Sequence, residues 1–133
     1  MRGSNGTITR EPLMSKTILF LYGTLKRGQK SHHFLEGQEF LGEATTMPLY
    51  RLYACDWHPA LVLDSEHGLE VKGELWAVDD HCLARMDEYE GTPHWFYRGD
   101  VAVRDCFETV QAYFYNGTFP PGTASGDVWP FIV

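Results

Sequence analysis

The sequence predicts an α+β domain in which a strongly curved or barrel-like sheet carries one longer helix at its side. Two observations favour this class. Short segments rich in β-branched and aromatic residues alternate with Pro and Gly, and one segment has the length and signals of a longer helix. The chain has 133 residues and no internal repeat, which indicates a single domain with its own core.

The first half of the chain is mostly predicted strand. Residues 17–22, TILFLY, form an apolar run ended by a glycine, which is typical of a buried strand. Residues 31–37, SHHFLEG, predict one or two helical turns with Ser31 as N-cap. Between residues 38 and 78, the segments EFLGEATTM, LYRLYA, ALVLD and VKGELWAV predict short strands, the first two separated at Pro48.

The second half contains the longer helix and a hairpin. The helix is predicted over DDHCLARMDEYEG, with Asp79 or Asp80 as N-cap and a glycine after its end. The segments YRGDVAVRD and FETVQAYFYN predict an antiparallel hairpin with a tight turn near Asp105 and Cys106.

The two ends of the chain have different compositions. Residues 1–14 are polar and aperiodic, so we expect a disordered leader or expression remnant, followed by a single domain over residues 15–133. The tail TFPPGTASGDVWPFIV has the Pro and Gly of a loop and an apolar end that we expect to pack back on the domain.

Charge and cysteine content exclude some function classes. Eleven Lys and Arg against 18 Asp and Glu give a net charge of -7, which argues against nucleic acid as a partner. No stretch approaches the ~20 apolar residues of a membrane span, so we expect no membrane association. The widely spaced Cys55, Cys82 and Cys106 are expected to be free thiols, and the predicted location is cytoplasmic.

The stretch FLYGTLKRGQ, residues 20–29, contains two glycines and a basic pair. Gly23 and Gly28 fit neither a Walker loop nor a dinucleotide fingerprint, because no Gly-Lys-Ser/Thr and no third spaced glycine follow. Two interpretations remain. The stretch is a plain turn in which Gly23 supplies an unusual backbone angle, or its backbone N–H groups form a small concavity for an anion such as a carboxylate.

One carboxylate of the predicted helix faces its apolar side. Glu90 falls within the apolar arc formed by Cys82, Leu83, Met86 and Tyr89. Desolvation raises the pKa of such a carboxyl group toward the range where it takes and returns a proton at neutral pH. The alternative is that the helix frays after Tyr89 and Glu90 lies in solvent.

Other candidate sites fail on spacing. Cys55 and His58 have a ligand spacing, but no second pair matches it, so we expect no metal. Asp87 and Glu90 lie one turn apart on one helix and do not flank a sugar from opposite sides, which argues against a glycosidase pair.

The motifs YGTLKRG and MDEYEG, in this order and spacing, resemble the γ-glutamylcyclotransferase-like superfamily. The similarity is to its short members, the γ-glutamylamine cyclotransferases and plant avirulence-induced-gene-like proteins, and runs from about Lys16 to Tyr115. The resemblance implies a small mixed β-barrel with a longer and a short helix at its side. It also implies a cavity for a γ-glutamyl small molecule, with no cofactor.

The resemblance assigns roles to particular residues. It implies that Glu90 is the acid–base residue of a cyclisation that yields 5-oxoproline and a free amine or amino acid. The implied substrate-binding residues are Tyr22, Gly23, Thr24, Leu25, Tyr97 and Tyr115. A second hypothesis is a non-catalytic small-ligand binding or regulatory module on the same fold. The γ-glutamyl compound and the oligomeric state stay open.

Overall fold

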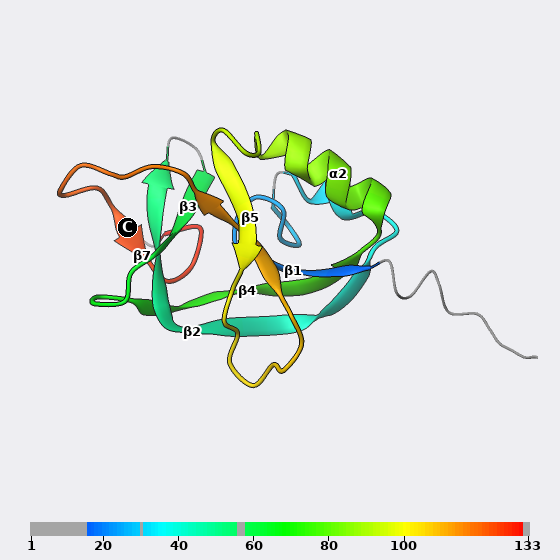
Figure 1. The fold of residues 1–133 in the computed structure, drawn as a ribbon, viewed down its shortest axis with the longest axis horizontal. Coiled ribbons are helices and arrows are strands. Elements are labelled where there is room, and N and C mark those ends of the chain that lie inside the picture. Colours follow the sequence, from blue (N-terminus) through cyan, green and yellow to red (C-terminus); the bar gives the residue numbers. More distant parts are fainter. Residues whose placement is uncertain (1–15, 30, 56–57, 132–133) are drawn as a thin grey trace, which may run out of the picture.

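The computed structural model describes residues 16–29, 31–55 and 58–131. Strands and helices follow in the order β1 (Thr17–Leu21), η1 (His32–Leu35), β2 (Glu39–Cys55), β3 (His58–Leu63), β4 (Leu69–Val78), α2 (Asp80–Tyr89), β5 (Phe96–Asp100), β6 (Gln111–Tyr115) and β7 (Ser125–Gly126). Five strands close into a barrel in the order β1-β4-β2-β3-β6, with β6 paired back to β1 (Figure 1). β6 runs parallel to β1 and β3, and β4 and β2 pair antiparallel with their neighbours. The predicted mixed barrel with one longer and one short helix is confirmed.

The first strand is buried on both faces, which explains its continuous apolar run. Leu19 and Leu21 pack in one core cluster with Met86 of α2. Phe20 points the other way and packs in a second cluster with Val71 of β4. Alternation along β1 thus connects two cores, and the strand ends between them at the turn that sequence analysis singled out.

The predicted break at Pro48 does not occur. β2 runs through this position without ending, and its register with β4 shifts on both sides of Pro48. A bulge of this kind accommodates a residue that lacks an N–H group, so the proline bends the strand and does not end it.

The predicted hairpin forms, but with a long connection. β5 and β6 pair antiparallel from Phe96↔Tyr115 to Asp100↔Gln111. Residues 101–110 join them and include a bridge between Val103 and Thr46 of β2. The prediction of a tight hairpin turn was therefore wrong. A local turn does lie where it was expected, because Asp105 has a left-handed φ of 61°.

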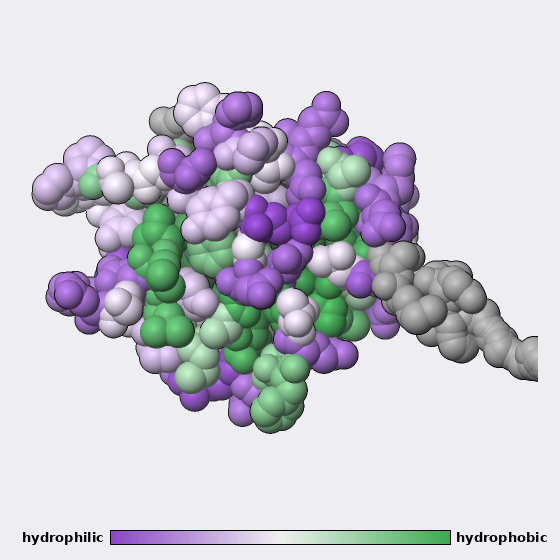
Figure 2. Space-filling model, viewed as in Figure 1, coloured by the Kyte–Doolittle hydropathy of each residue, from purple (hydrophilic) through white to green (hydrophobic). Residues whose placement is uncertain are grey.

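Both helices begin at the predicted residues. The Asp79 side chain accepts a hydrogen bond from the Cys82 amide at 2.8 Å, and Gly91 follows the end of α2 with φ 70°. Ser31 is the N-cap residue of η1, although its side chain makes no capping hydrogen bond. Figure 2 shows mostly hydrophilic residues along the outer edge of α2, and Met86 of the same helix is fully buried.

The C-terminal tail packs on the barrel as expected. β7 pairs with β2, and Trp129 and Phe131 pack against the second core cluster. The expected leader, residues 1–14, lies outside the described residues. Within the described part of the chain, no helix is long and apolar enough to span a membrane, and no three His, Cys, Asp or Glu side chains are grouped to hold a metal ion.

Candidate active site

A cavity of about 450 Å³ lies where the turn after β1 meets the end of α2 and the strand β6. This volume is within the range of small-molecule sites. Six of the seven residues expected at the site line the cavity: Tyr22, Gly23, Thr24, Leu25, Glu90 and Tyr115. The fold therefore brings together two motifs that lie more than 60 residues apart in the sequence.

The turn after β1 contributes buried residues to the wall of this cavity. It is closed by hydrogen bonds from the Lys26 amide to the Gly23 carbonyl at 3.1 Å and from the Ser31 amide to the Thr24 carbonyl at 2.7 Å. Among the described residues, the amides of Gly23, Thr24 and Leu25 donate to no acceptor, although all three residues are buried. Buried N–H groups are almost always paired, so these are candidate donors to a ligand.

Gly23 is needed for close packing and not for an unusual backbone angle. Its φ does not lie in the left-handed region, so the turn does not need glycine for an unusual backbone angle. A Cβ at this position would lie 2.8 Å from Cγ and 3.0 Å from Cδ of Pro59 on β3. Glycine is required here because the turn packs directly against the proline ring.

The basic pair of the turn points away from the cavity. The Arg27 amide and Nε donate to Glu74 at 3.0 and 3.1 Å, and Lys26 Nζ donates to the Trp129 carbonyl at 2.6 Å. Both side chains anchor the outer side of the turn, to β4 and to the tail, and neither lines the cavity.

Glu90 is the acidic residue of the cavity. It caps α2 in a helical conformation, with φ −79° and ψ −6°, and its amide donates to the Met86 carbonyl at 2.9 Å, so the helix does not fray after Tyr89. Among the described residues, no side chain or backbone group donates a hydrogen bond to its carboxylate. Burial raises the pKa of Glu90 from its usual 4.5 to about 7, which lets it accept and return a proton near neutral pH.

Tyr89 connects the turn to the helix end. Its hydroxyl lies 2.6 Å from Ser31 Oγ and 3.4 Å from Thr24 Oγ1. This contact holds the residue directly before Glu90 against the turn that carries these three amides.

Two further tyrosines stand beside the glutamate. Burial raises the pKa of Tyr22 and of Tyr113, and the nearby charge of Glu90 raises both further, so their hydroxyl groups stay protonated. The Tyr22 hydroxyl donates to the Tyr113 carbonyl at 2.6 Å, and the Tyr113 hydroxyl donates to Asp87 Oδ1 at 2.6 Å. Tyr113 was not among the site residues predicted from the sequence. Its period-two spacing from Tyr115 on one strand is the signal that indicates a shared face.

Tyr97 does not lie at the cavity, which corrects the expectation that it is near the pocket. It is 43% exposed, and its ring stacks on Phe114. Alternate residues of a strand point to opposite faces, so the neighbouring Phe96 lines the cavity instead, together with its cross-strand partner Tyr115. A shift of one residue along β5 separates the expected position from the observed one.

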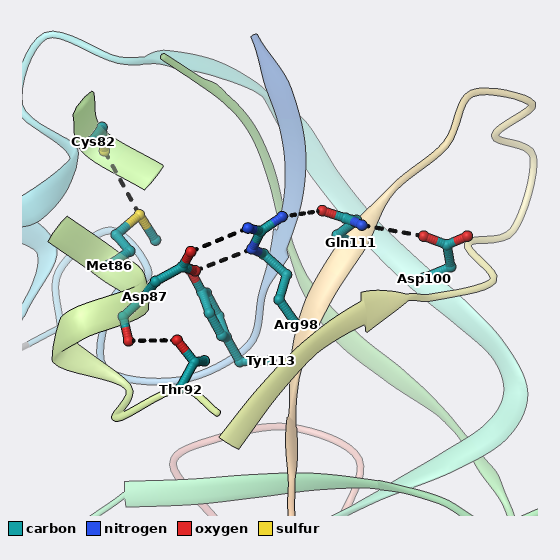
Figure 3. A network of polar contacts seen from close by, with 8 residues as sticks. All are labelled: Cys82, Met86, Asp87, Thr92, Arg98, Asp100, Gln111 and Tyr113. Carbon is teal, nitrogen blue, oxygen red and sulfur yellow. Dashed lines mark hydrogen bonds and ion pairs between the residues drawn. The ribbon is translucent and has the colours of Figure 1, made fainter. Parts of the chain in front are cut away.

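The polar network behind the cavity is centred on Asp87 (Figure 3). Arg98 Nε and Nη2 donate to its two carboxylate oxygens at 3.0 and 3.1 Å. Asp87 is thus engaged with the β5–β6 hairpin and does not line the cavity with Glu90.

Comparison with known proteins identifies the family of this chain. The family described as "Gamma-glutamyl cyclotransferase, AIG2-like" matches residues 19–129. A putative gamma-glutamylcyclotransferase of Vibrio cholerae is 38% identical over 101 residues, which cover 76% of this chain and 84% of that protein. The gamma-glutamylaminecyclotransferase of Bos taurus is 34% identical over 113 residues, which cover 77% and 67%.

Solved structures show the same fold. The crystal structure of an AIG2-like protein from Mus musculus superposes with a TM-score of 0.72 at 27% identity, covering 86% of this chain and 88% of that one. Family match, relatives and fold agree over most of the chain. The chain therefore belongs to the AIG2-like gamma-glutamyl cyclotransferase family.

Proposed function

We propose that the protein is an enzyme that cyclises the γ-glutamyl group of a γ-glutamyl amine or γ-glutamyl amino acid to 5-oxoproline and releases the amine. The observation that carries the proposal is the pairing of Glu90, whose pKa is about 7, with a turn at the same cavity whose amides of Gly23, Thr24 and Leu25 have no acceptor among the described residues. Family membership supports the same class of substrate.

In the proposed complex, the amides of Gly23, Thr24 and Leu25 bind the α-carboxylate or the developing oxyanion of the substrate. Glu90 as carboxylate takes a proton from the α-ammonium group. The free α-nitrogen then attacks the γ-carbonyl carbon of the same molecule. Because both groups belong to one bound substrate, the cavity only has to hold the folded conformer that closes a five-membered ring.

The protons of the proposed cyclisation balance when one residue first accepts and then donates them. The α-nitrogen loses two protons on the way from ammonium to ring N–H. The departing nitrogen gains two as the γ-carbon–nitrogen bond breaks and it leaves as an ammonium group. Glu90 carries protons from the first nitrogen to the second, so the reaction requires neither added water nor an oxidant.

The aromatic wall of the cavity is suited to the leaving amine. Phe96 and Tyr115 pack against each other with ring centroids 5.6 Å apart, and Trp95 stands at the rim with 68% of its surface exposed. Such a wall contacts the carbon chain of the amine and leaves its far end toward solvent.

The test is release of 5-oxoproline from a panel of γ-glutamyl amines and dipeptides. We expect turnover by the wild type, and a loss of at least ~100-fold in Glu90→Gln, with unchanged circular dichroism. Glu88→Gln is the matched control, because Glu88 is exposed on the same helix and should keep full activity. Thermal stabilisation by these compounds without 5-oxoproline would instead support the binding-module hypothesis, and retained turnover in Glu90→Gln would contradict the mechanism.

A further inference from the structure

The carboxylate of Asp87 is held from two neighbouring strands at once (Figure 3). Arg98 on β5 donates from Nε to Oδ1 and from Nη2 to Oδ2, and Tyr113 on β6 donates from its hydroxyl to Oδ1 at 2.6 Å. Bidentate guanidinium–carboxylate pairs fix orientation as well as distance. The side chains of Asp87 and Arg98 are only 28% and 29% exposed, so solvent screens the pair less than a surface ion pair.

The strand side of this network is itself braced. Arg98 and Tyr113 are cross-strand partners, so their side chains leave the same face of the hairpin. Arg98 Nη1 donates to Gln111 Oε1 at 2.6 Å, and Gln111 Nε2 donates to Asp100 Oδ1 at 3.4 Å. The guanidinium therefore has little freedom to follow Asp87 if the helix moves.

The helix side of the network leads directly to Glu90, three residues after Asp87. The Asp87 carbonyl accepts hydrogen bonds from the Thr92 amide at 3.1 Å and from Thr92 Oγ1 at 2.9 Å. These bonds join Thr92 back to Asp87 and so close a short backbone loop that contains Glu90. A force on the Asp87 side chain is thus transmitted to the position of Glu90.

We propose that Asp87, held by Arg98 and Tyr113, is a positioning residue that keeps Glu90 at the cavity. The kinetic part of this inference rests on the proposed function, and its structural part does not. Without the clamp, the end of α2 is no longer tied to β5 and β6, and the Glu90 carboxylate gains access to water. The other titratable groups that line the cavity with Glu90 are Tyr22, Cys55, His58, Tyr89, Tyr113 and Tyr115.

The first test is Asp87→Asn, which keeps the size of the side chain and loses its charge. The ¹³C-carboxyl resonance of Glu90 is followed by NMR against pH. We expect its midpoint to fall from about 7 toward 4.5, since access to water favours the charged form. We also expect kcat for 5-oxoproline release to fall about 10- to 100-fold with KM nearly unchanged.

Asp127→Asn is the matched control. It breaks the ion pair of Asp127 with Lys72, a hydrogen bond of 2.8 Å on the exposed side of β4, and should change neither the Glu90 midpoint nor kcat. Where Asp87→Asn does not fold, Tyr113→Phe removes one hydrogen bond and should shift the midpoint in the same direction by a smaller amount.

An unchanged Glu90 midpoint in the folded variants would overturn the positioning role, whatever the kinetics. A shifted midpoint in a protein that never releases 5-oxoproline would support the clamp and contradict the proposed function. The two hypotheses therefore fail separately.

Discussion

A buried and a partly buried glutamate lie on opposite sides of the turn that joins β1 to η1, and they differ in the hydrogen bonds that their carboxylates accept. Glu74, 7% exposed, faces the outer side and accepts hydrogen bonds from the Arg27 amide, the Arg27 guanidinium and the Trp76 indole. Glu90 faces the cavity, and among the described residues no donor contacts its carboxylate.

The pKa values of the two groups move in opposite directions. Burial alone raises the pKa of Glu74, but the hydrogen bonds from Arg27 and Trp76 outweigh it, and the pKa is lowered. Burial without such donors raises the pKa of Glu90 to about 7. The comparison shows that partners, and not burial alone, separate an anchoring carboxylate from one prepared to exchange a proton.

Glu90→Gln should give the largest change in the free energy of unfolding. The folded state keeps a proton on Glu90 that the unfolded state releases between about pH 4.5 and 7, so native stability falls as pH rises through this window. The neutral amide avoids this loss. We expect a gain of up to about 3 kcal/mol at pH 8 and little difference at pH 5, measured by urea unfolding.

Glu74→Gln is the matching substitution on the other side of the turn and should have the opposite sign. Its amide group places a donor against the Arg27 guanidinium and removes the charge that these donors bind. We expect a loss of about 2 kcal/mol at pH 8 that shrinks at acid pH, because a lowered carboxyl pKa contributes stability only while the group is ionised. Equal effects of the two substitutions in urea would remove the distinction between the glutamates.

Gly23→Ala tests the contact between the turn and β3. The new Cβ would lie 2.8 Å from the Pro59 ring, so the turn must move, and we expect a loss of about 1–2 kcal/mol together with a raised KM. Gly99→Ala is the control, because its nearest neighbour lies 3.4 Å away, at ordinary contact distance. A loss at both positions would indicate a general cost of alanine and not the contact with proline.

Tyr97→Ala should have the smallest effect on activity. The side chain lies on the outer face of β5, and we expect 5-oxoproline release within about twofold of the wild type. The free energy of unfolding should fall by about 1 kcal/mol, because the stacking of Tyr97 on Phe114 is lost. Phe96→Ala, one residue earlier and in the cavity wall, should impair turnover much more. A larger loss of turnover in Tyr97→Ala than in Phe96→Ala would instead support Tyr97 as a substrate-binding residue.

The sequence predicted the features that depend on local pattern. Apolar runs located the strands, cap residues located α2, and the helical wheel placed Glu90 on the inner face. The faces of strands and the lengths of long connections were harder to predict from the sequence. The prediction placed Tyr97 on the wrong face, because the face of β5 is set by its register with β6. The prediction made the connection over residues 101–110 too short, because its bridge to Thr46 is a tertiary contact. The Asp87–Arg98 pair was missed because it joins a helix to a strand that pack only in the finished fold.

The most direct test of the account is the pH dependence of kcat/KM for 5-oxoproline release. Its acidic limb reports the ionisation of the essential base in the free enzyme. With Glu90 as that base, kcat/KM should fall about tenfold per pH unit below pH 7 and level off above it. An acidic limb centred near pH 4.5, or a flat profile between pH 5 and 8, would contradict the assignment of Glu90.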